Sequence, residues 1–437
     1  MSTLIVPSVS QEFFNELART AKKASFASFE SIGNALKYLE TNGLPTSKNE
    51  DYKYCNIEAL VRREFKKLDG HFLPLTKTST STDNNTAKEI RLNLWNGEIV
   101  EDLTRQNFPE EIVIASLRQA SESYPEIFYS HFGKHVHESS DALIAMNTAY
   151  SGDGLYIHVR KNAAIRPVIR ITHIGAAEGS VAQHHHHLIV LEENAQVKII
   201  HEFVNNNSGA KYFSNHLTEI ALSPSSHLEL VTLQNAQNGY YGFHTIQSKQ
   251  QSNSVLRLNT ITLDGNFIRN NVNAVVQGEN AETNLNGLTL STSGQLVDHH
   301  TLVDHAAPNC TSNELYKGIA TDKSTLIFNG KIQVRRDSQK INAYQSSKNI
   351  LLSDDATVNT KPQLEIFAND VKCSHGTSTG KVDESALFYL KSRGIGSSTA
   401  KKLLLHAFAS EILSKVEIDF LQTELQEKVE TAIESAC

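Results

Sequence analysis

The long β-rich middle of the chain restricts its fold more than any other feature. From about residue 141 to residue 367, short runs rich in β-branched and aromatic residues follow one another, with polar turns between them and scarcely any helical periodicity. So many short strands are typical of a β-sandwich, a β-barrel or a parallel β-helix. The runs that predict strands are 155–159, 168–174, 187–191, 196–203, 216–222, 227–233, 255–263, 274–276, 286–290, 295–303, 325–334, 350–352 and 364–367.

Three properties of this segment favour the parallel β-helix. The strands are numerous, Asn-rich corners recur, and Asn-Gly pairs, which favour tight hairpins, occur only at 238–239, 286–287 and 329–330. No strict sequence repeat is present, so we expect a solenoid with irregular turns. The residues assigned to corners are Asn205 to Asn207, Asn266, Asn270, Asn271, Asn284 and Asn286.

The N-terminal part of the chain is predicted to be mostly helical. Apolar residues at helical spacing indicate one or two amphipathic helices within 10–40, ended by Asn42-Gly43 and Pro45. A short strand at 92–95 and a helix at about 109–123 follow. The polar run after this region gives way to the β-rich segment near Asp141.

The C-terminal part also predicts helices. Asp383 caps a helix that runs through Arg393, Ser397 or Ser398 caps a second, and a third covers 420–435. We therefore expect a mostly helical region over 1–140, a parallel β-helix core over 141–380 and a helical region over 381–437.

The composition excludes several classes of partner. Charged residues make up 20% and hydrophobic residues 39% of the 437 residues, and the formal net charge is -7. No basic excess favours nucleic acid or an anionic membrane surface. The N-terminus lacks a positively charged leader, and no stretch approaches the about 20 apolar residues of a membrane-spanning helix. A cytoplasmic location is expected, in which Cys55, Cys310, Cys373 and Cys437 are reduced thiols.

The stretch from 360 to 394 concentrates the chemistry. Alternating apolar and polar residues in 364–368 and 371–375 predict strands, in which positions i and i+2 face the same side. Cys373 and His375 would then point the same way, and a thiolate with an imidazole suits iron or an iron–sulfur fragment. Two donors do not complete a site, so a metal here needs donors from elsewhere. The alternative is a buried cysteine beside a histidine that hydrogen-bonds in the core.

A neighbouring run imitates a nucleotide-binding loop. The sequence GTSTGK at 376–381 has three rather than four residues between its glycines, and Val382 rather than Ser or Thr follows the lysine. We therefore expect a turn that closes the preceding strand, and no nucleotide site.

Histidines gather in three further places, each with a structural alternative. The first group is expected at a solvated helix end. The run of four alternates faces in a strand, so only two of its members could meet one metal, and polar decoration at a strand entrance is the preferred interpretation. In the third group, a metal site, an acid–base pair and structural stacking all stay open. The groups are His131, His135 and His137; His184 to His187; and His299, His300 and His305 with Asp298 and Asp304.

Several blocks of sequence resemble the SufB/SufD family of iron–sulfur cluster assembly proteins. The chain resembles the SufD branch rather than the SufB branch, because residues 339–353 contain no cysteine and His375 is followed by Gly-Thr rather than Glu-Ala. The matching blocks include DVKCSHG at 370–376 and LFYLKSRGI at 387–395. The others are 312–319, 328–332, 338–340, 351–353 and 360–366, with weaker matches at 43–45, 52–54 and 143–150.

The resemblance implies a right-handed parallel β-helix flanked by helical regions, in a non-catalytic scaffold that pairs with its paralogue SufB and binds the ATPase SufC. It carries His375 over as a ligand for iron or a nascent iron–sulfur cluster at the SufB interface, with Cys373 a second candidate. It is also compatible with a flavin in the complex and with a homodimer of the isolated chain. SufC would dock on the C-terminal helices, at Phe388, Tyr389, Leu390, Arg393, Gly394 and Ile395.

The resemblance also suggests a mechanism and leaves two alternatives. Closure of two SufC subunits on ATP would strain the SufB–SufD interface and expose the buried donors. One alternative is a β-helix carbohydrate-active enzyme, for which Asp298 and Asp304 are the best carboxylate pair. The other is a purely structural scaffold without metal contact.

Overall fold

The computed structural model describes residues 8–20, 28–75, 88–103, 108–136, 140–205, 209–237 and 239–436. Several sequence predictions fall outside these residues, namely those for Asn206, Asn207, Asn238, His137 and Cys437. The other three cysteines, Cys55, Cys310 and Cys373, are free thiols as predicted.

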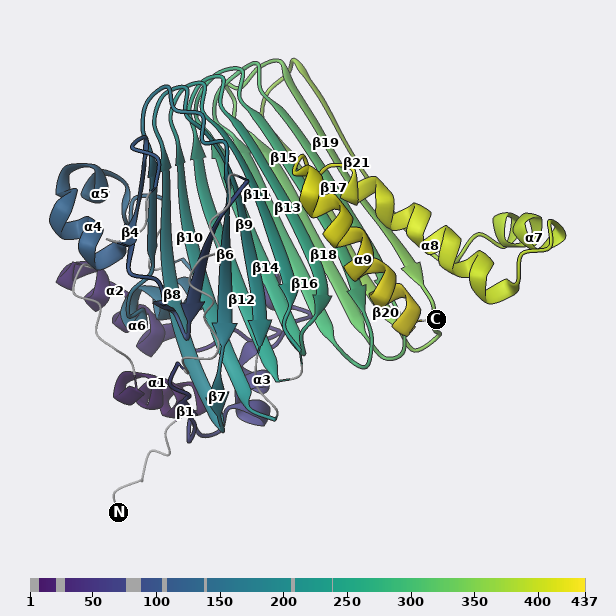
Figure 1. Ribbon diagram of the computed structural model, residues 1–437, viewed down its shortest axis with the longest axis horizontal. Coiled ribbons are helices and arrows are strands. Elements are labelled where there is room, and N and C mark those ends of the chain that lie inside the picture. Colours follow the sequence, from purple (N-terminus) through teal and green to yellow (C-terminus); the bar gives the residue numbers. More distant parts are fainter. Residues whose placement is uncertain are drawn as a thin grey trace.

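Most of the chain winds into a parallel β-helix of about seven turns, and 44% of the structure is strand. Successive strands alternate between two long sheets, and strands two apart in the chain pair side by side (Figure 1). We name the sheets after their last strands. The β20 sheet contains β4 (Ile112–Ser116), β5 (Leu155–Val159), β8 (Ser180–Leu191), β10 (Lys211–Leu222), β12 (Tyr240–Gln250), β14 (Phe267–Val276), β16 (Leu296–His305), β18 (Thr325–Val334) and β20 (Thr357–Ile366). The β21 sheet contains β3 (Glu98–Ile99), β2 (Glu89–Trp95), β6 (Val168–Gly175), β9 (Gln196–Asn205), β11 (His227–Asn235), β13 (Val255–Asp264), β15 (Glu282–Ser291), β17 (Thr311–Ala320), β19 (Ile341–Leu351) and β21 (Val371–Gly380).

Helices flank this core at both ends of the chain, which confirms the predicted fold class. Gly43 ends one N-terminal helix as predicted, and the strand at 112–116 replaces the first part of the helix expected over 109–123. The helices are α1 (Val9–Thr20), α2 (Phe29–Asn42), α3 (Ile57–Glu64), α4 (Leu117–Ser123), α5 (Pro125–His131), α6 (Ala142–Tyr150), α7 (Glu384–Ser392), α8 (Ser397–Leu413) and α9 (Asp419–Ala436), and the short strand β1 (His71–Phe72) pairs with β7 (Ala177–Glu178).

The turns of the β-helix differ in length. Paired residues on neighbouring strands are 26 positions apart where Tyr241 lies beside Phe267, and 32 positions apart where Thr325 lies beside Thr357. This variation explains why no strict repeat is visible in the sequence, although the coils repeat in space.

The corners use asparagine, but mostly at other positions than those predicted. Asn270 and Asn271 lie within β14, and Asn284 and Asn286 lie within β15, so their assignment to corners is wrong. Asparagine tolerates left-handed backbone angles better than other residues with a Cβ, which suits it to a sharp corner. The asparagines that take positive φ angles between strands are Asn96, Asn162, Asn194, Asn253, Asn280 and Asn309.

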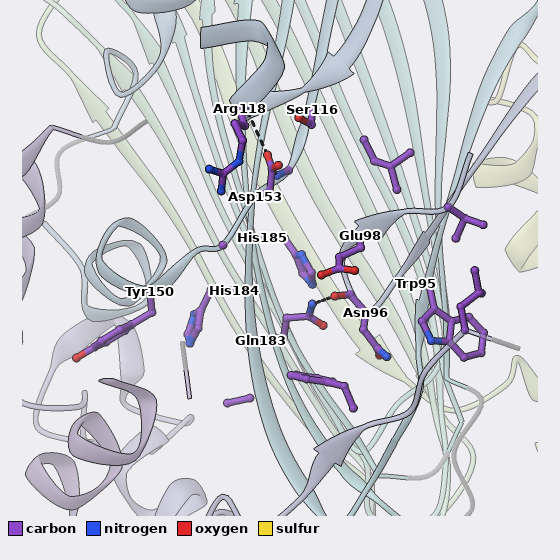
Figure 2. A pocket seen from close by; sticks show the side chains of 18 of the residues that line it. Trp95, Asn96, Glu98, Ser116, Arg118, Tyr150, Asp153, Gln183, His184 and His185 are labelled. Atoms are coloured by element: carbon purple, nitrogen blue, oxygen red, sulfur yellow. Dashed lines mark hydrogen bonds between the residues drawn. The ribbon is translucent and has the colours of Figure 1, made fainter. Parts of the chain in front are cut away.

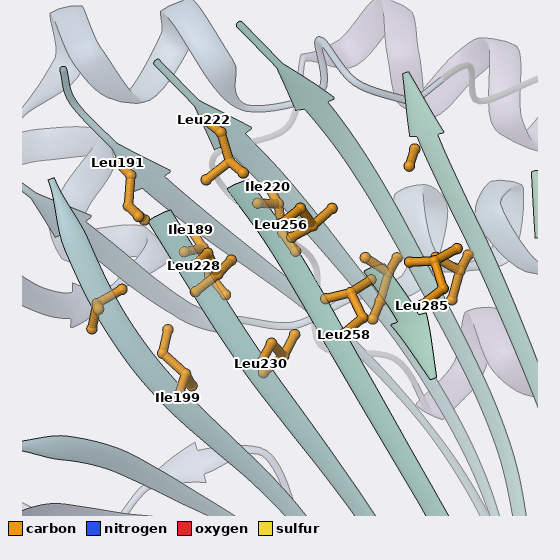
Figure 3. Close-up of a cluster of buried hydrophobic side chains, with 14 of the residues drawn as sticks. Ile189, Leu191, Ile199, Ile220, Leu222, Leu228, Leu230, Leu256, Leu258 and Leu285 are labelled. Atoms are coloured by element: carbon orange, nitrogen blue, oxygen red, sulfur yellow. The ribbon is translucent and has the colours of Figure 1, made fainter. Parts of the chain in front are cut away.

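The interior of the β-helix is apolar along one side. Leucine and isoleucine side chains from the two sheets meet there, close to the corners (Figure 3). Because side chains alternate across a strand, about every second residue of each strand points into the interior. The residues labelled in the figure are Ile189, Leu191, Ile199, Ile220, Leu222, Leu228, Leu230, Leu256, Leu258 and Leu285.

The helices cover the outer faces of the two sheets. Side chains of α1, α2, α3 and α6 pack on Phe213, Phe243 and Phe267 of the β20 sheet. Side chains of α8 and α9 pack on the β21 sheet, at residues such as Ile261 and Ile319. Figure 1 shows α9 lying across that sheet, whereas α8 leads away from it and carries α7 at its far end.

A buried ion pair lies beneath the N-terminal region. The guanidinium of Arg269 pairs with Asp298, and the ring of Tyr52 lies 4.0 Å from it. Asp304 pairs instead with Arg335 at 2.6 Å. Both carboxylates are buried and each serves a different arginine, so they do not form the paired carboxylates that a carbohydrate-active enzyme would need.

We expect the Asp298→Asn substitution to lower the free energy of unfolding by about 3–5 kcal/mol, because it leaves the buried Arg269 charge without its partner. The matched control is Asp304→Asn, which we expect to cost only about 1 kcal/mol because Arg335 is 53% exposed. Denaturant-induced unfolding of both variants measures the difference, and equal losses would contradict the structural role given to Arg269.

Candidate site at the open end of the β-helix

The two sheets end in uncovered strands. Among the described residues, no strand pairs with the outer edge of β20 or of β21, although each is ten residues long. Pro362 lies in β20, which suits an edge because proline cannot donate a backbone hydrogen bond. Ile366 is 37% exposed and Phe367 is 61% exposed at the adjoining corner. Proteins normally shield long edge strands, so this end has the character of an interface.

Cys373 and His375 lie on β21, in the strand predicted for them. Cys373 pairs with Ala343 of β19, and His375 pairs with Gln345. Both partners are buried, so Cys373 and His375 occupy the inward-facing positions of the last turn. Cys373 is half-buried and packs against the apolar core, whereas His375 is exposed because no further turn covers it.

The thiol of Cys373 has the properties of a metal ligand that stays protonated until a metal ion binds. Burial raises the pKa of its thiol, so the thiol keeps its proton at neutral pH. A metal ion stabilises the thiolate and releases that proton on binding. The imidazole of His375 is available beside it on the same face of the strand.

A polar column lies beneath His375. Glu314 of β17 and Gln345 of β19 occupy the same inward position in the two preceding turns. Glu314 and Gln345 interact with each other, and neither Oε1 of Glu314 nor the side-chain amide of Gln345 has a hydrogen-bond partner elsewhere in the described part of the chain. Gly330 on the opposite sheet makes room for Gln345, since a Cβ at that position would lie 2.3 Å from its Nε2.

Sequence reasoning missed Glu314 and Gln345. The strand that holds Glu314, β17, was not predicted, because its sequence TSNELYKGIA is mostly polar. A period-two reading of this block would have placed Glu314 between Ser312 and Tyr316 on one face. That pattern is the only signal in the sequence for a buried carboxyl here.

Glu314 predicts a specific dependence of stability on pH. Burial raises its pKa from 4.5 to about 7, and the hydroxyl of Thr301 donates a hydrogen bond to it at 2.5 Å. The folded chain therefore holds this proton up to a higher pH than the unfolded chain does. The resulting stabilisation is complete below pH about 4.5 and is lost as the pH rises to about 7.

We expect the free energy of unfolding of the original chain, relative to that of Glu314→Gln, to fall by about 3 kcal/mol between pH 4.5 and pH 7.5. Glutamine keeps the size of the side chain and cannot ionise. Thermal or denaturant unfolding of both proteins at several pH values measures the difference, in which all shared titrations cancel. A difference that does not change with pH would show that Glu314 has an ordinary pKa.

The run GTSTGK at 376–381, which resembles a nucleotide-binding loop, lies almost entirely within a strand. Residues Gly376 to Gly380 continue β21 to its end, so the expected turn is wrong. Pairing with β19 extends from Val371 beside Ile341 to Gly380 beside Ile350, and this pairing holds the run extended. An extended strand cannot wrap its backbone N–H groups around a phosphate as a nucleotide loop does.

The helix after β21 is unusual because it buries none of its residues. Asp383 caps α7 by accepting hydrogen bonds from the backbone of Ser385 and Ala386, as the sequence predicted. Phe388 is 73% exposed and Tyr389 is 57% exposed. Large aromatic side chains that protrude in this way are typical of a surface that receives another protein.

The end of α7 also follows the prediction. Gly394 has a φ of +87°, which glycine adopts readily, and the N–H of Ile395 bonds to the carbonyl of Leu390 at 3.2 Å. The guanidinium of Arg393 lies 5.4 Å from the centre of the Tyr389 ring. Leu390 and Ile395 are half-buried, so the six residues named for docking surround one turn and the end of α7.

The other histidine groups have different environments from those predicted. His184 to His187 are buried in the middle of β8, so their placement at a strand entrance is wrong, although their alternation between faces is confirmed. His135 is partly buried beside Glu219, and burial lowers its pKa to about 4. His299 and His305 point inward to Thr289 and Ser312, at 2.9 Å each, and His300 lies 3.0 Å from Asp298 on the outer face.

The chain matches two family models that together cover most of its length. Residues 10–171 match the SufBD protein N-terminal region, and residues 173–408 match the SUF system FeS cluster assembly, SufBD core domain. No helix in the described residues combines the length and the apolar character needed to cross a membrane.

Curated proteins give the same result. The chain is 28% identical to iron-sulfur cluster assembly protein SufD of Escherichia coli over 403 residues, which cover 90% of each chain. It is 27% identical to an iron-sulfur cluster assembly SufBD family protein of Synechocystis, over 88% of this chain and 87% of that protein. It is 26% identical to the chloroplastic protein ABCI7 of Arabidopsis thaliana, over 88% of this chain and 86% of that protein. The chain therefore belongs to the SufB/SufD family of iron–sulfur cluster assembly proteins.

Proposed function

We propose that this chain is a scaffold subunit without catalytic activity of its own, which contributes His375, and secondarily Cys373, to a site where an iron–sulfur cluster is built. The cluster or its iron is cargo of the assembly system. The observation that carries the proposal is a pair of inward-facing donors on an uncovered last turn. Such a pair is half of a coordination sphere, and the uncovered edge is where a second protein would supply the rest.

The partner at this end is proposed to be a SufB-type paralogue. A second β-helix could continue the sheets past β20 and β21 by strand pairing, because both edges present unpaired backbone groups. The exposed side chains of Ile366 and Phe367 would be buried in the same contact. The polar column of Glu314 and Gln345 would then lie inside the joined molecules, directly below the cluster.

The partner at α7 is proposed to be a SufC-type ATPase. Phe388 and Tyr389 offer apolar anchors, and α8, whose buried residues pack on the β21 sheet, connects α7 to that sheet. Only two residues separate the end of β21 from the Asp383 cap of α7. Movement of a docked ATPase would therefore act on the strand that holds Cys373 and His375.

Four further expectations belong to this proposal. The division into 1–140, 141–380 and 381–437 would separate a covering region, the ligand-bearing core and the ATPase-docking region. The chain would work in the cytoplasm. A homodimer of the isolated chain through the same open end, and a flavin in the complex, are expectations that the size and the visible absorption of purified complexes would test.

Co-expression with a SufB-type and a SufC-type protein tests the proposal. We expect the three proteins to elute together, and the complex to take up iron and sulfide on anaerobic reconstitution while the isolated chain takes up neither. Elution of the chain alone would contradict the partner assignment. Equal iron and sulfide in complexes with and without this chain would instead support a purely structural scaffold.

A further inference from the structure

Six buried histidines meet inside the β-helix, several turns away from His375. They come from five different strands, and each is 6% exposed or less. His185, His216 and His244 lie side by side on β8, β10 and β12. Their rings stack at centroid distances of 4.5 Å and 5.2 Å. The six residues, which we call the histidine cluster, are His173, His185, His187, His201, His216 and His244.

Three members of the histidine cluster have the spacing of a metal site. Each of His173, His187 and His216 presents a ring nitrogen within 4.8 Å of those of the other two. Nitrogen ligands about 2.1 Å from a tetrahedral ion lie about 3.4 Å from one another. Small rotations of these side chains would therefore bring the three nitrogens to bonding distance.

The histidine cluster lacks the hydrogen bonds that buried imidazoles normally make. Both nitrogens of His173, Nδ1 of His216 and Nε2 of His187 and of His201 have no partner in the described residues. Buried polar atoms are normally satisfied, and unpaired ones indicate water or an ion.

The orientation of His216 favours a ligand role. Its Nε2 lies 2.7 Å from the hydroxyl of Ser214, which can accept the Nε2 proton and leave a lone pair on Nδ1, an atom with no partner in the described residues. His187 is constrained differently, because its Nδ1 accepts the backbone N–H of Leu155 at 3.1 Å. A metal ion on the ring of His187 would displace its hydrogen bond with Leu155. His173 and His216 are therefore the better supported two of the three ligands.

The histidine cluster adjoins a cavity of about 790 Å³ near the first turns of the β-helix. His184 and His185 line this cavity together with Gln183, Asn96 and Glu98, as Figure 2 shows. The loop that carries Gly97 approaches the ring of His185 closely, since a Cβ on Gly97 would lie 1.9 Å from its Cε1. The ring of His185 thus connects the cavity with His216.

We propose that the histidine cluster binds one divalent ion of borderline softness, such as zinc, through His173, His187 and His216. Three imidazoles leave a fourth position for water or hydroxide, which would also offset part of the charge of the ion. This site is separate from the cluster-building site proposed at Cys373 and His375, and it does not depend on the function proposed there.

The test uses the full-length chain with Cys373→Ala and His375→Ala, so that the open end cannot contribute. After chelation and dialysis, this protein is titrated with Zn²⁺ by calorimetry, and its zinc-loaded form is examined by X-ray absorption. We expect one ion per chain, bound by about three imidazole nitrogens and no sulfur. No bound zinc, or zinc bound mainly by oxygen ligands, would overturn the proposal. All six residues of the histidine cluster are unaltered in this experiment.

A second comparison assigns the ligands. Adding His173→Gln and His216→Gln should weaken zinc binding at least 100-fold, whereas the control His299→Gln, at a buried histidine outside the cluster, should leave it unchanged. Undiminished binding in the folded double variant would overturn the assignment. If that variant does not fold, the absorption spectrum of the parent protein still decides whether three imidazoles hold the ion.

Discussion

Replacement of His375 by alanine is expected to leave the complex with SufB-type and SufC-type partners intact while its iron and sulfide content falls at least about tenfold. The side chain is exposed in the isolated chain, so the loss would arise from the missing ligand. Anaerobic reconstitution followed by iron and sulfide analysis measures the effect, and size-exclusion chromatography reports the assembly.

The matched control is His227→Ala, because His227 is also exposed but lies at the start of β11 on a different turn. Its complex should hold as much iron as the original. Cys373→Ala should give an intermediate loss if the thiol is the second donor. Normal cluster yield in the His375→Ala complex would refute the role given to this imidazole.

The second large effect is expected at α7. The Phe388→Asp substitution places a charge on the most exposed aromatic ring of the helix, and it should weaken capture of the SufC-type ATPase at least about 30-fold, as truncation of an anchoring aromatic residue does. Co-purification on a tag carried by this chain measures the recovery of the ATPase. Pairing with the SufB-type protein should persist, because the open end is formed by β20 and β21 and Phe388 lies on neither strand.

Ser385→Asp provides the control for this experiment. It adds the same charge to the first turn of α7, where an acidic side chain is favourable to the helix. Recovery of the ATPase should therefore be close to that of the original chain. Full recovery with Phe388→Asp would contradict docking at this surface.

The fold was predictable where local pattern and environment agree. Strands with apolar inward positions, such as β9 and β13, could be predicted from their runs of β-branched and other apolar residues. Asp383 and Gly394 indicated the two ends of α7, because aspartate favours the N-cap of a helix and glycine favours its C-terminal end. The apolar pattern did not predict strands whose inward-facing side chains are polar. The strand β12, YYGFHTIQSKQ, carries His244 inside and was missed.

Helix α6 was missed for the opposite reason. All but one of its nine residues are buried, so its sequence ALIAMNTAY has no polar face and no helical periodicity of the amphipathic kind. The corners were misplaced because asparagine is as frequent within β14 and β15 as between strands. Only the register between neighbouring turns of the β-helix distinguishes an asparagine within a strand from one at a corner.

One candidate site could be predicted from local sequence, whereas the other depends on how distant strands pair. Cys373 and His375 are two residues apart, so strand periodicity alone places them on one face. The histidine cluster draws on strands from β6 to β12, whose separation in sequence varies from coil to coil. No local pattern can indicate that His173 meets His216, and the contact follows only from the pairing of the sheets.

The claim that the open end is the partner surface has a direct test in hydrogen exchange. Those backbone amides of β21 (Val371–Gly380) that point away from β19 are expected to exchange at least about tenfold more slowly in the complex with a SufB-type protein than in the isolated chain, because the edge becomes a paired strand. Amides around the distant corner at Asn253 should exchange alike in both. Unchanged exchange in β21 within a stable complex would contradict the account, since the partner would then bind elsewhere.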